Sequence, residues 1–399
     1  MKVTIIGGGA SGLMAAISAA NSGYNVTILE RLDRIGKKIL ATGNGRCNFT
    51  NINSDIKNFH GKNPDFIKKA MNTFWVNETI SFFEELGMLT TVEENGKAYP
   101  YSLQASAVLD VLRFEIERLN INVITNFEVK SIIKKNDFFL IESYDGNQER
   151  SDKVIISTGG KASPSLGSNG SGYDIVKKLG HTLTDIFPSL VQIKTDTKYV
   201  KALKGIKVNA NVTVKNNAVL GLSSGEVLFT DYGLSGPAIF DISRLIAEHK
   251  NTKIILDLLP RIDYNSLREL LIKRKSQTRN LENYFVGMLN KKVGMTLMKY
   301  TDVLPYQRSS DTLTDKEIEA LIKAIKSFEF EALGTTSWNN AQVTAGGIST
   351  DEVNPQTLES KLIKGLYITG EVLDIDGDCG GHNLQWAWTS GYIAGKCLW

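Results

Sequence analysis

Residues 3–12 read Val3-Thr4-Ile5-Ile6-Gly7-Gly8-Gly9-Ala10-Ser11-Gly12, a short apolar run followed by a glycine-rich turn. The turn fits the pattern G-x-G-x-x-G. Gly7 allows a tight turn, Gly9 lets backbone N–H groups approach a pyrophosphate, and Gly12 lets a helix pack closely on a strand. The residues expected to surround that pyrophosphate are Gly7, Gly9, Ala10, Ser11 and Gly12.

The residues after the turn supply the rest of a dinucleotide-binding unit. Residues 13–21 are rich in Ala, Leu, Met and Ile and predict a helix, which Gly23 ends. Residues 25–29 predict a second strand, and Glu30 follows it, 18 residues after Gly12. An acid at this distance from the glycine turn can accept hydrogen bonds from the ribose hydroxyls. We expect its neighbour Arg31 to contact the cofactor as well. An ordinary glycine turn would need neither this helix nor this acid, so the context predicts dinucleotide binding.

A polar loop dense in glycine follows at residues 37–48. Backbone donors and positive charge in such a loop can wrap a diphosphate or a flavin ring, although a solvated basic loop has a similar composition. We expect cofactor contacts from Lys37, Lys38, Thr42, Gly43, Asn44, Gly45, Arg46 and Cys47.

Other predicted strands also end in small residues, where backbone can pass close to a cofactor. A final helix that begins near residue 384 would direct its positive end to the N1/O2 edge of a flavin and favour the reduced state. Glu371 is expected to accept a hydrogen bond from a ribityl or ribose hydroxyl, and the backbone of Val129 to meet an adenine edge. The remaining expected contacts are Thr158, Gly159, Gly160, Gly370, Gly381, Asn383 and Leu384.

The pattern along the chain predicts an α/β protein with insertions. We expect a Rossmann-like FAD-binding domain of the glutathione-reductase type in two pieces, residues 1–190 and 336–399. Short β-like runs predict a β-barrel insert at residues 191–260, with about 328–335. Residues 261–327 read as a small helical insert with a basic composition. That charge is typical of a solvated face, so a nucleic-acid partner is the less favoured interpretation.

The composition of the chain narrows the class of protein further. The chain has 399 residues and a formal net charge of +3, too small to argue for nucleic acid or a membrane surface. No apolar run is long enough to span a membrane, and the N-terminus reads as a strand and not as a signal peptide. Three cysteines form no disulfide framework, so a cytoplasmic location is expected; a redox pair of Cys47 and Cys379 is the weaker alternative.

Several other motifs lack residues that the sites they resemble require. The glycine loop at residues 167–172 has the wrong spacing for a second nucleotide fingerprint, so no separate NAD(P)-binding unit is expected. Residues 374–378 resemble a calcium loop, but Cys379 stands where glycine is needed. The four histidines show no metal-ligand spacing, so no metal is expected. No acid or base stands out, and the catalytic candidates are Arg46 and His382.

Together these motifs resemble the aminoacetone oxidase-like flavoproteins, a bacterial family in the glutathione-reductase-type FAD superfamily. That family also includes proteins linked to the reduction of 3-oxo-Δ4,6 bile-acid intermediates. The resemblance covers nearly the whole chain, and it implies bound FAD, a β-barrel insert and a small helical insert. His382 stands where the family usually has Tyr, and Cys379 is not a typical family feature. The motifs that carry the resemblance are residues 7–12, 36–38 with 43–48, 157–160, 229–230 with 233–237, and 370–371 with Asp374 and 380–381.

We therefore expect an FAD-dependent oxidoreductase that acts on a small-molecule substrate, with NAD(P)H as a transient electron donor or dioxygen as acceptor. Three alternatives stay open: a tRNA-modifying flavoprotein, an aminoacetone-type amine oxidase, and a non-catalytic electron carrier. The sequence assigns no oligomeric state.

Overall fold

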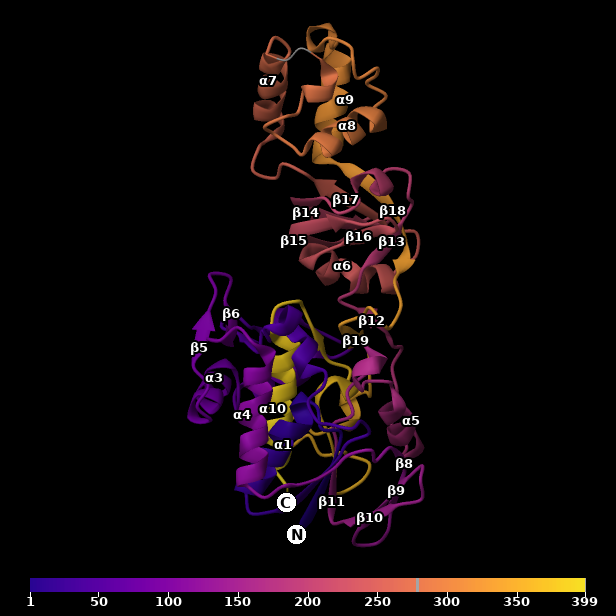
Figure 1. Cartoon of the computed structure of the whole chain (residues 1–399). Helices are drawn as coiled ribbons and strands as arrows, with labels where there is room; N and C mark the ends of the chain where they lie inside the picture. The colour runs from indigo at the N-terminus through magenta and orange to yellow at the C-terminus, as the bar shows by residue number, and fades with distance from the viewer. Residues whose placement is uncertain (278–279, 399) are drawn as a thin grey trace. The chain divides into compact units, whose positions relative to one another are not determined.

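The computed structural model describes residues 1–277 and 280–398 (Figure 1). The chain divides into two compact units. The first joins residues 1–188 with 338–399, and the second comprises residues 189–337. Each unit has its own hydrophobic core.

The first unit is built on a five-stranded sheet in the order β20-β11-β1-β2-β7. All neighbouring strands run parallel; Val3 of β1, for example, pairs with Val26 on one side and Lys153 on the other. The chain first adds strands on one side of β1 (β2 and β7) and then on the other (β11 and β20), so the strand order reverses at β1. Sheets of this kind bind their ligands at such a reversal, beyond the carboxyl ends of the strands. The strands are β1 (Lys2–Ile6), β2 (Asn25–Leu29), β7 (Asn122–Ile124), β11 (Lys153–Ile156) and β20 (Leu366–Ile368).

Two helices from opposite ends of the sequence, α1 (Ala10–Asn21) and α10 (His382–Lys396), pack against each other (Figure 1). Glycine makes this approach close. A Cβ on Gly391 would lie 2.3 Å from the carbonyl oxygen of Ser11, and one on Gly395 would lie 2.4 Å from that of Ala15. The other helices of this unit are α2 (Ile67–Met71), α3 (Val76–Glu85), α4 (Ala105–Arg118) and α5 (Ser171–Lys178).

Small antiparallel sheets complete the first unit. The three-stranded sheets are β10-β9-β8, with β8 (Val129–Lys134), β9 (Phe139–Ser143) and β10 (Gln148–Ser151), and β3-β6-β5, with β3 (Thr50–Asn51), β5 (Thr90–Val92) and β6 (Lys97–Pro100). The two-stranded pairs are β4 (Phe59–His60) with β21 (Asp376–Gly377), and β12 (Phe187–Ser189) with β19 (Val343–Ala345).

The second unit contains a closed six-stranded barrel in the order β13-β16-β15-β14-β17-β18, with β13 also paired to β18. The strands are β13 (Ile193–Thr195), β14 (Lys207–Lys215), β15 (Val219–Phe229), β16 (Gly233–Ser235), β17 (Lys253–Asp257) and β18 (Phe328–Thr335). The helices are α6 (Pro237–Glu248), α7 (Tyr264–Arg274), α8 (Lys291–Tyr300) and α9 (Asp315–Lys326), and they share one core with the barrel. The expected Rossmann-like fold with an inserted barrel is confirmed.

One predicted helix has a different boundary. The first helix begins at Ala10 and not at residue 13, because Gly9 is already its N-cap. Residues 72–75 separate α2 from α3. In the barrel, β15 continues through Gly225, because its pairing with β14 holds this glycine in the ladder. Among the described residues, no helix is both long and apolar enough to cross a bilayer.

Candidate functional site

The glycine turn between β1 and α1 leaves no room for side chains at two of its three fingerprint positions. Gly7 has a φ of +102°, and a Cβ there would lie 2.5 Å from the carbonyl oxygen of Ser157. A Cβ on Gly12 would lie 1.9 Å from the carbonyl oxygen of Gly7. At Gly9, by contrast, a Cβ would meet no atom of the described residues within 4 Å apart from its own neighbours along the chain. Open space therefore adjoins the N-terminus of α1, whose free N–H groups and partial positive charge suit an anion.

Glu30 ends β2 with its carboxylate fixed by backbone donors. One carboxylate oxygen accepts from the N–H of Gly8 at 2.8 Å, and the other accepts from the N–H of Leu32, also at 2.8 Å. The chain near Val129 lies beside it, because the N–H of Phe127 donates to the Glu30 carbonyl at 2.9 Å. The neighbouring Arg31 donates to the carbonyl of Gly167 at 3.2 Å. Each oxygen of Glu30 retains a lone pair that can accept a ribose hydroxyl.

The loop after residue 38 is held in a compact, left-handed conformation. Gly43 and Asn44 have φ values of +56° and +55°, and the N–H of Cys47 donates back to the carbonyl of Thr42 at 3.0 Å. Arg46 lies 4.5 Å from the ring centroid of Tyr99. Its guanidinium also forms an ion pair with Glu93 at 3.1 Å, so Arg46 contacts both Tyr99 and Glu93. Burial raises the pKa of the Cys47 thiol to about 12, and a hydrogen bond with Thr42 offsets a part of this rise.

Lys38 and Glu371 join this loop to the end of β20. Their side chains form an ion pair of 3.0 Å. The second oxygen of Glu371 accepts from the N–H of Thr344 at 2.7 Å. A Cβ on Gly160 would lie 2.3 Å from the Thr344 hydroxyl and 2.8 Å from the Glu371 carboxylate, so a side chain is excluded there. Gly370 is equally confined, since a Cβ would lie 2.6 Å from the hydroxyl of Ser11.

Two buried polar atoms near these segments lack a hydrogen-bond partner among the described residues: Oδ1 of Asn48 and Oγ1 of Thr158. Asn48 uses its amide nitrogen on the carbonyls of Thr50 and Ala98, at 2.8 and 2.9 Å. Thr158 follows β11, at the carboxyl edge of the sheet. A buried acceptor without a donor is costly, and the hydroxyl and imide N–H groups of FAD are such donors. The residues present therefore fit FAD.

The N-terminus of α10 is the third part of the candidate site. Its N-cap, Gly381, has a φ of +97°, and a Cβ there would lie 2.6 Å from the Thr50 carbonyl oxygen. Asn383, in the first turn, is tied to Gly377: it accepts from the Gly377 N–H at 2.8 Å and donates to its carbonyl at 2.7 Å. Leu384, the next residue, is partly buried against the core. The helix end is thus anchored to the loop that precedes it.

His382 is buried, with 5% of its surface exposed. Its Nδ1 lies 2.9 Å from the hydroxyl of Ser54. Burial lowers the pKa of His382 to about 4; Asp378 opposes this shift, and Lys97 and His60 add to it. The imidazole is therefore neutral at pH 7, which makes His382 a poor proton donor.

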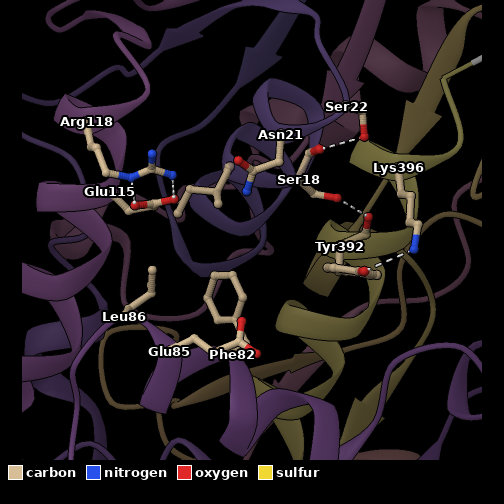
Figure 2. A pocket seen from close by; sticks show the side chains of 11 residues that line it. Ser18, Asn21, Ser22, Phe82, Glu85, Leu86, Glu115, Arg118, Tyr392 and Lys396 are labelled. Carbon is tan, nitrogen blue, oxygen red and sulfur yellow. Dashed lines mark hydrogen bonds and ion pairs between the residues drawn. The ribbon is translucent and has the colours of Figure 1, made fainter.

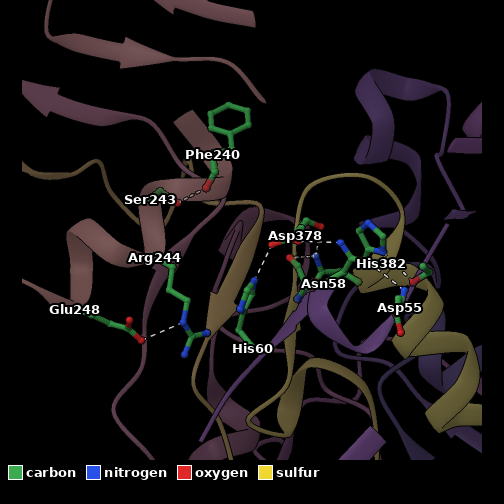
Figure 3. A network of polar contacts seen from close by, with 12 residues as sticks. Asp55, Asn58, His60, Phe240, Ser243, Arg244, Glu248, Asp378 and His382 are labelled. Atoms are coloured by element: carbon green, nitrogen blue, oxygen red, sulfur yellow. Dashed lines mark hydrogen bonds and ion pairs between the residues drawn. The ribbon is translucent and has the colours of Figure 1, made fainter. Parts of the chain in front are cut away.

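A pair that the sequence analysis did not single out lies close to this helix end (Figure 3). His60 Nε2 lies 2.7 Å from one carboxylate oxygen of Asp378, and the Asn58 amide donates to the other at 3.1 Å. No local spacing could reveal the pair, because pairing of β4 with β21 joins residues 318 positions apart.

A cavity of about 580 Å³ lies elsewhere in the first unit (Figure 2). It is lined by the last turns of α1, α3, α4 and α10, with Glu85 and Glu115 among the lining residues. These are the opposite ends of α1 and α10 from Gly9 and Gly381. None of the residues predicted to bind the dinucleotide lines this cavity, and the helix C-termini around it carry partial negative charge, which disfavours phosphate. Within the described part of the chain, no group of three His, Cys, Asp or Glu side chains could hold a metal.

The fold and the arranged residues define an FAD-dependent oxidoreductase of the Rossmann type. More specifically, the chain belongs to the family described as HI0933-like protein Rossmann domain, which residues 1–397 match. The bile-acid-reductase side of the expected resemblance is confirmed by the first relative described below.

That relative is a 3-dehydro-bile acid delta(4,6)-reductase from Clostridium scindens. It is 41% identical over 404 residues, which cover 99% of this chain and 98% of the relative. A ribosomal RNA dihydrouridine synthase from Haemophilus influenzae is 32% identical over 97% of this chain and 96% of its own length. Among solved structures, a flavocytochrome c3 fumarate reductase has a TM-score of 0.49 and 17% identity, with 99% of this chain and 77% of that chain covered.

Proposed function

We propose that this flavoenzyme reduces a carbon–carbon double bond conjugated with a carbonyl group in a steroid-like small molecule. The observation that carries the proposal is the 41% identity, over nearly the full length of both chains, with a relative named as a delta(4,6)-reductase of 3-dehydro bile acids. A 3-oxo group next to a Δ4 double bond is a conjugated enone. The dihydrouridine synthase relative is consistent with the same chemistry, since the 5,6 double bond of uridine is also conjugated with a carbonyl.

Bound FAD would supply the hydride for this reduction. Under the proposal, Glu30 and the N-terminus of α1 hold the ADP half, while the loop at 37–48 and the Lys38–Glu371 pair border the flavin half. The N-terminus of α10 would stabilise the negative charge of the reduced cofactor. At Gly160 and Gly370 the side chains of Thr344, Glu371 and Ser11 leave no room for a Cβ, so the chain packs tightly beside the proposed flavin half.

NAD(P)H is the proposed electron donor. The sequence contains one dinucleotide fingerprint, at residues 7–12, so the nicotinamide would bind transiently and leave after reducing the flavin. This arrangement needs no second Rossmann unit. An amine oxidase of the aminoacetone type would instead take its electrons from the amine and pass them to dioxygen.

Anaerobic absorption spectra of the purified holoenzyme test the proposal. Bleaching of the flavin by NADH or NADPH, followed by recovery on addition of a 3-oxo-4-ene steroid, is the expected result. Mass spectrometry should then show a product two mass units heavier. Bleaching by aminoacetone and recovery in air would favour the oxidase, and a reduced flavin that no enone reoxidises would contradict the enone-reductase proposal.

The second candidate is reduction of uridine in ribosomal RNA, and a charge asymmetry favours it. Residues 189–337 carry 22 Lys and Arg against 16 Asp and Glu, a formal charge of +6, whereas the first unit carries 24 against 27, a charge of −3. Cationic surfaces bind RNA with a strong salt dependence. Loss of a dihydrouridine from ribosomal RNA when the protein is deleted would support this candidate, and unchanged RNA would exclude it.

A further inference from the structure

Gly380, in the loop before α10, lies among side chains that carry hydrogen-bond donors. A Cβ built on Gly380 would lie 3.5 Å from Cε of Lys97 and 3.6 Å from Nε2 of His382. It would also lie 3.6 Å from the amide nitrogen of Asn51, which already donates to the Gly380 carbonyl. These are ordinary contact distances, so the place where a side chain would begin can accept one atom of a bound molecule. Gly380 and Lys97 are both partly exposed, so a small molecule can reach it.

The ring of His382 is oriented by a serine. Among the described residues it makes one hydrogen bond, between Nδ1 and the hydroxyl of Ser54 at 2.9 Å. The Ser54 hydroxyl has no other acceptor in that part of the chain, so it donates its hydrogen to Nδ1. The ring hydrogen of the neutral imidazole then lies on Nε2. Nε2 is therefore a hydrogen-bond donor beside Gly380.

The imidazole of His382 keeps this hydrogen at neutral pH (Figure 3). Burial lowers its pKa to about 4; the carboxylate of Asp378 opposes this shift, and the charges of Lys97 and His60 add to it. A neutral imidazole can donate a hydrogen bond without releasing its proton, which suits it to stabilise a negatively charged oxygen. His382 also lies in the first turn of α10, where the partial positive charge of the helix favours an anion.

Lys97 contributes a positive charge to the same place. It begins β6, and the pairing of β3 with β6 sets it opposite Asn51. Within the described residues, its ammonium group forms no ion pair with an acid. The ammonium is close enough to His382 for its charge to lower the pKa of the imidazole. The ammonium group, Nε2 and the helix end therefore all favour a negatively charged oxygen at Gly380.

We propose that Nε2 of His382 and the ammonium group of Lys97 bind the carbonyl oxygen of the substrate at Gly380 and stabilise the enolate that forms there. This inference rests on the proposed enone reduction. The β-carbon takes a hydride from the reduced cofactor, the electrons of the C=C bond shift to form the C=C bond of the enolate, and the carbonyl electron pair moves onto oxygen. The two donors hold this oxyanion until solvent supplies a proton to the α-carbon, which restores the carbonyl. Neither residue gives up its own proton.

The first test determines which ring nitrogen of His382 carries the hydrogen. Nitrogen NMR of histidine-labelled holoenzyme at neutral pH makes this distinction, and H382F assigns the signals. We expect Nε2–H with Nδ1 as the acceptor, and S54A should shift the population toward Nδ1–H. Nδ1–H as the main form in wild type overturns the proposal, whatever the activity of the enzyme.

The second test measures, by calorimetry, how the oxidised holoenzyme binds an oxygen that resembles an enolate. Estradiol has a phenolic oxygen where the substrate has its 3-oxo group, and 3-deoxyestradiol lacks that oxygen. Wild type should bind estradiol roughly 10-fold more tightly or better, and H382F and K97M should each remove most of this preference. H249F and K135M, at a histidine near the end of α6 and at an exposed lysine between β8 and β9, are the matched controls and should keep it.

Equal binding of the two steroids to wild type, or a preference that survives in both H382F and K97M, overturns this proposal. Anaerobic stopped flow then measures flavin reoxidation by a 3-oxo-4-ene steroid, which H382F should slow roughly 100-fold, as loss of an oxyanion donor does. The flavin absorbance of each variant shows that it is folded and loaded. Reoxidation of H382F at the wild-type rate also overturns the proposal, whereas a wild-type enzyme that no enone reoxidises overturns the proposed function itself.

Discussion

The backbone N–H of Gly8 donates a hydrogen bond to the carboxylate of Glu30, and the two groups lie 2.8 Å apart. This bond joins the glycine turn after β1 to the acid that ends β2. Glu30 is 9% exposed, and its second oxygen accepts from Leu32. The residue therefore organises the turn even before a ribose binds.

Glu30→Ala should weaken FAD retention. The ribose loses its acceptor, and the N–H groups of Gly8 and Leu32 lose theirs; buried donors left unpaired cost about 1–3 kcal/mol each. We expect FAD affinity to fall roughly 10- to 100-fold, measured from the flavin content of purified protein and by FAD titration of apoprotein. Glu30→Gln, which keeps one acceptor oxygen, should be intermediate. Wild-type flavin content in Glu30→Ala would contradict this placement of the ribose.

The glycines of the turn should respond differently to substitution. Gly9 has a φ of −84° and open space around its Cβ position, so Gly9→Val should fold normally yet lose FAD, because the side chain occupies the space proposed for the pyrophosphate. Gly12→Ala would bring a Cβ within 1.9 Å of the Gly7 carbonyl oxygen, so the turn must shift and stability should fall. Urea unfolding and flavin absorbance distinguish the two effects. A stable, yellow Gly9→Val protein would show that something else binds this turn.

Stability should depend on the protonation of His382. Its pKa in the folded protein is about 4, below the 6.5 of an exposed histidine. Between these values the unfolded chain binds more protons, so His382 contributes its full stabilisation above about pH 6.5 and loses it as the pH falls toward 4. The contribution is up to about 3 kcal/mol. Urea unfolding at pH 7.5, 6 and 5 should show a steeper loss in wild type than in His382→Gln, and equal slopes would refute this assignment.

Cys47 should be unreactive in the folded protein. A pKa of about 12 in place of 9.0 lowers the thiolate fraction at neutral pH about 1,000-fold, and the side chain is fully buried. Iodoacetamide followed by peptide mass spectrometry should leave Cys47 unlabelled until the protein is unfolded. Rapid labelling under native conditions, or a disulfide between Cys47 and Cys379, would restore the redox-pair alternative.

The local parts of the fold could be predicted, because the period and order of residues 3–30 encode a strand, a turn and a helix directly. The inserted barrel was also visible in its short β-like runs. The pairing of His60 with Asp378 could not be predicted, since two-residue strands leave no periodic signal and their partner is hundreds of residues away. The low pKa of His382 could not be predicted for a related reason: its main cause is burial, and that burial depends on tertiary packing, including the contact with the Phe59 ring.

The packing of α10 on α1 has a consequence for the order in which the protein can form during synthesis. A ribosome makes α1 first, then the whole insert at 189–337, and α10 only afterwards. Domains fold as units while the chain emerges, so the insert can be complete while the first unit still lacks β20 and its partner helix. Until then the surface of α1 that Gly391 and Gly395 cover stays exposed. Cofactor loading is therefore expected to be a late event, after release of the C-terminal segment from the ribosome.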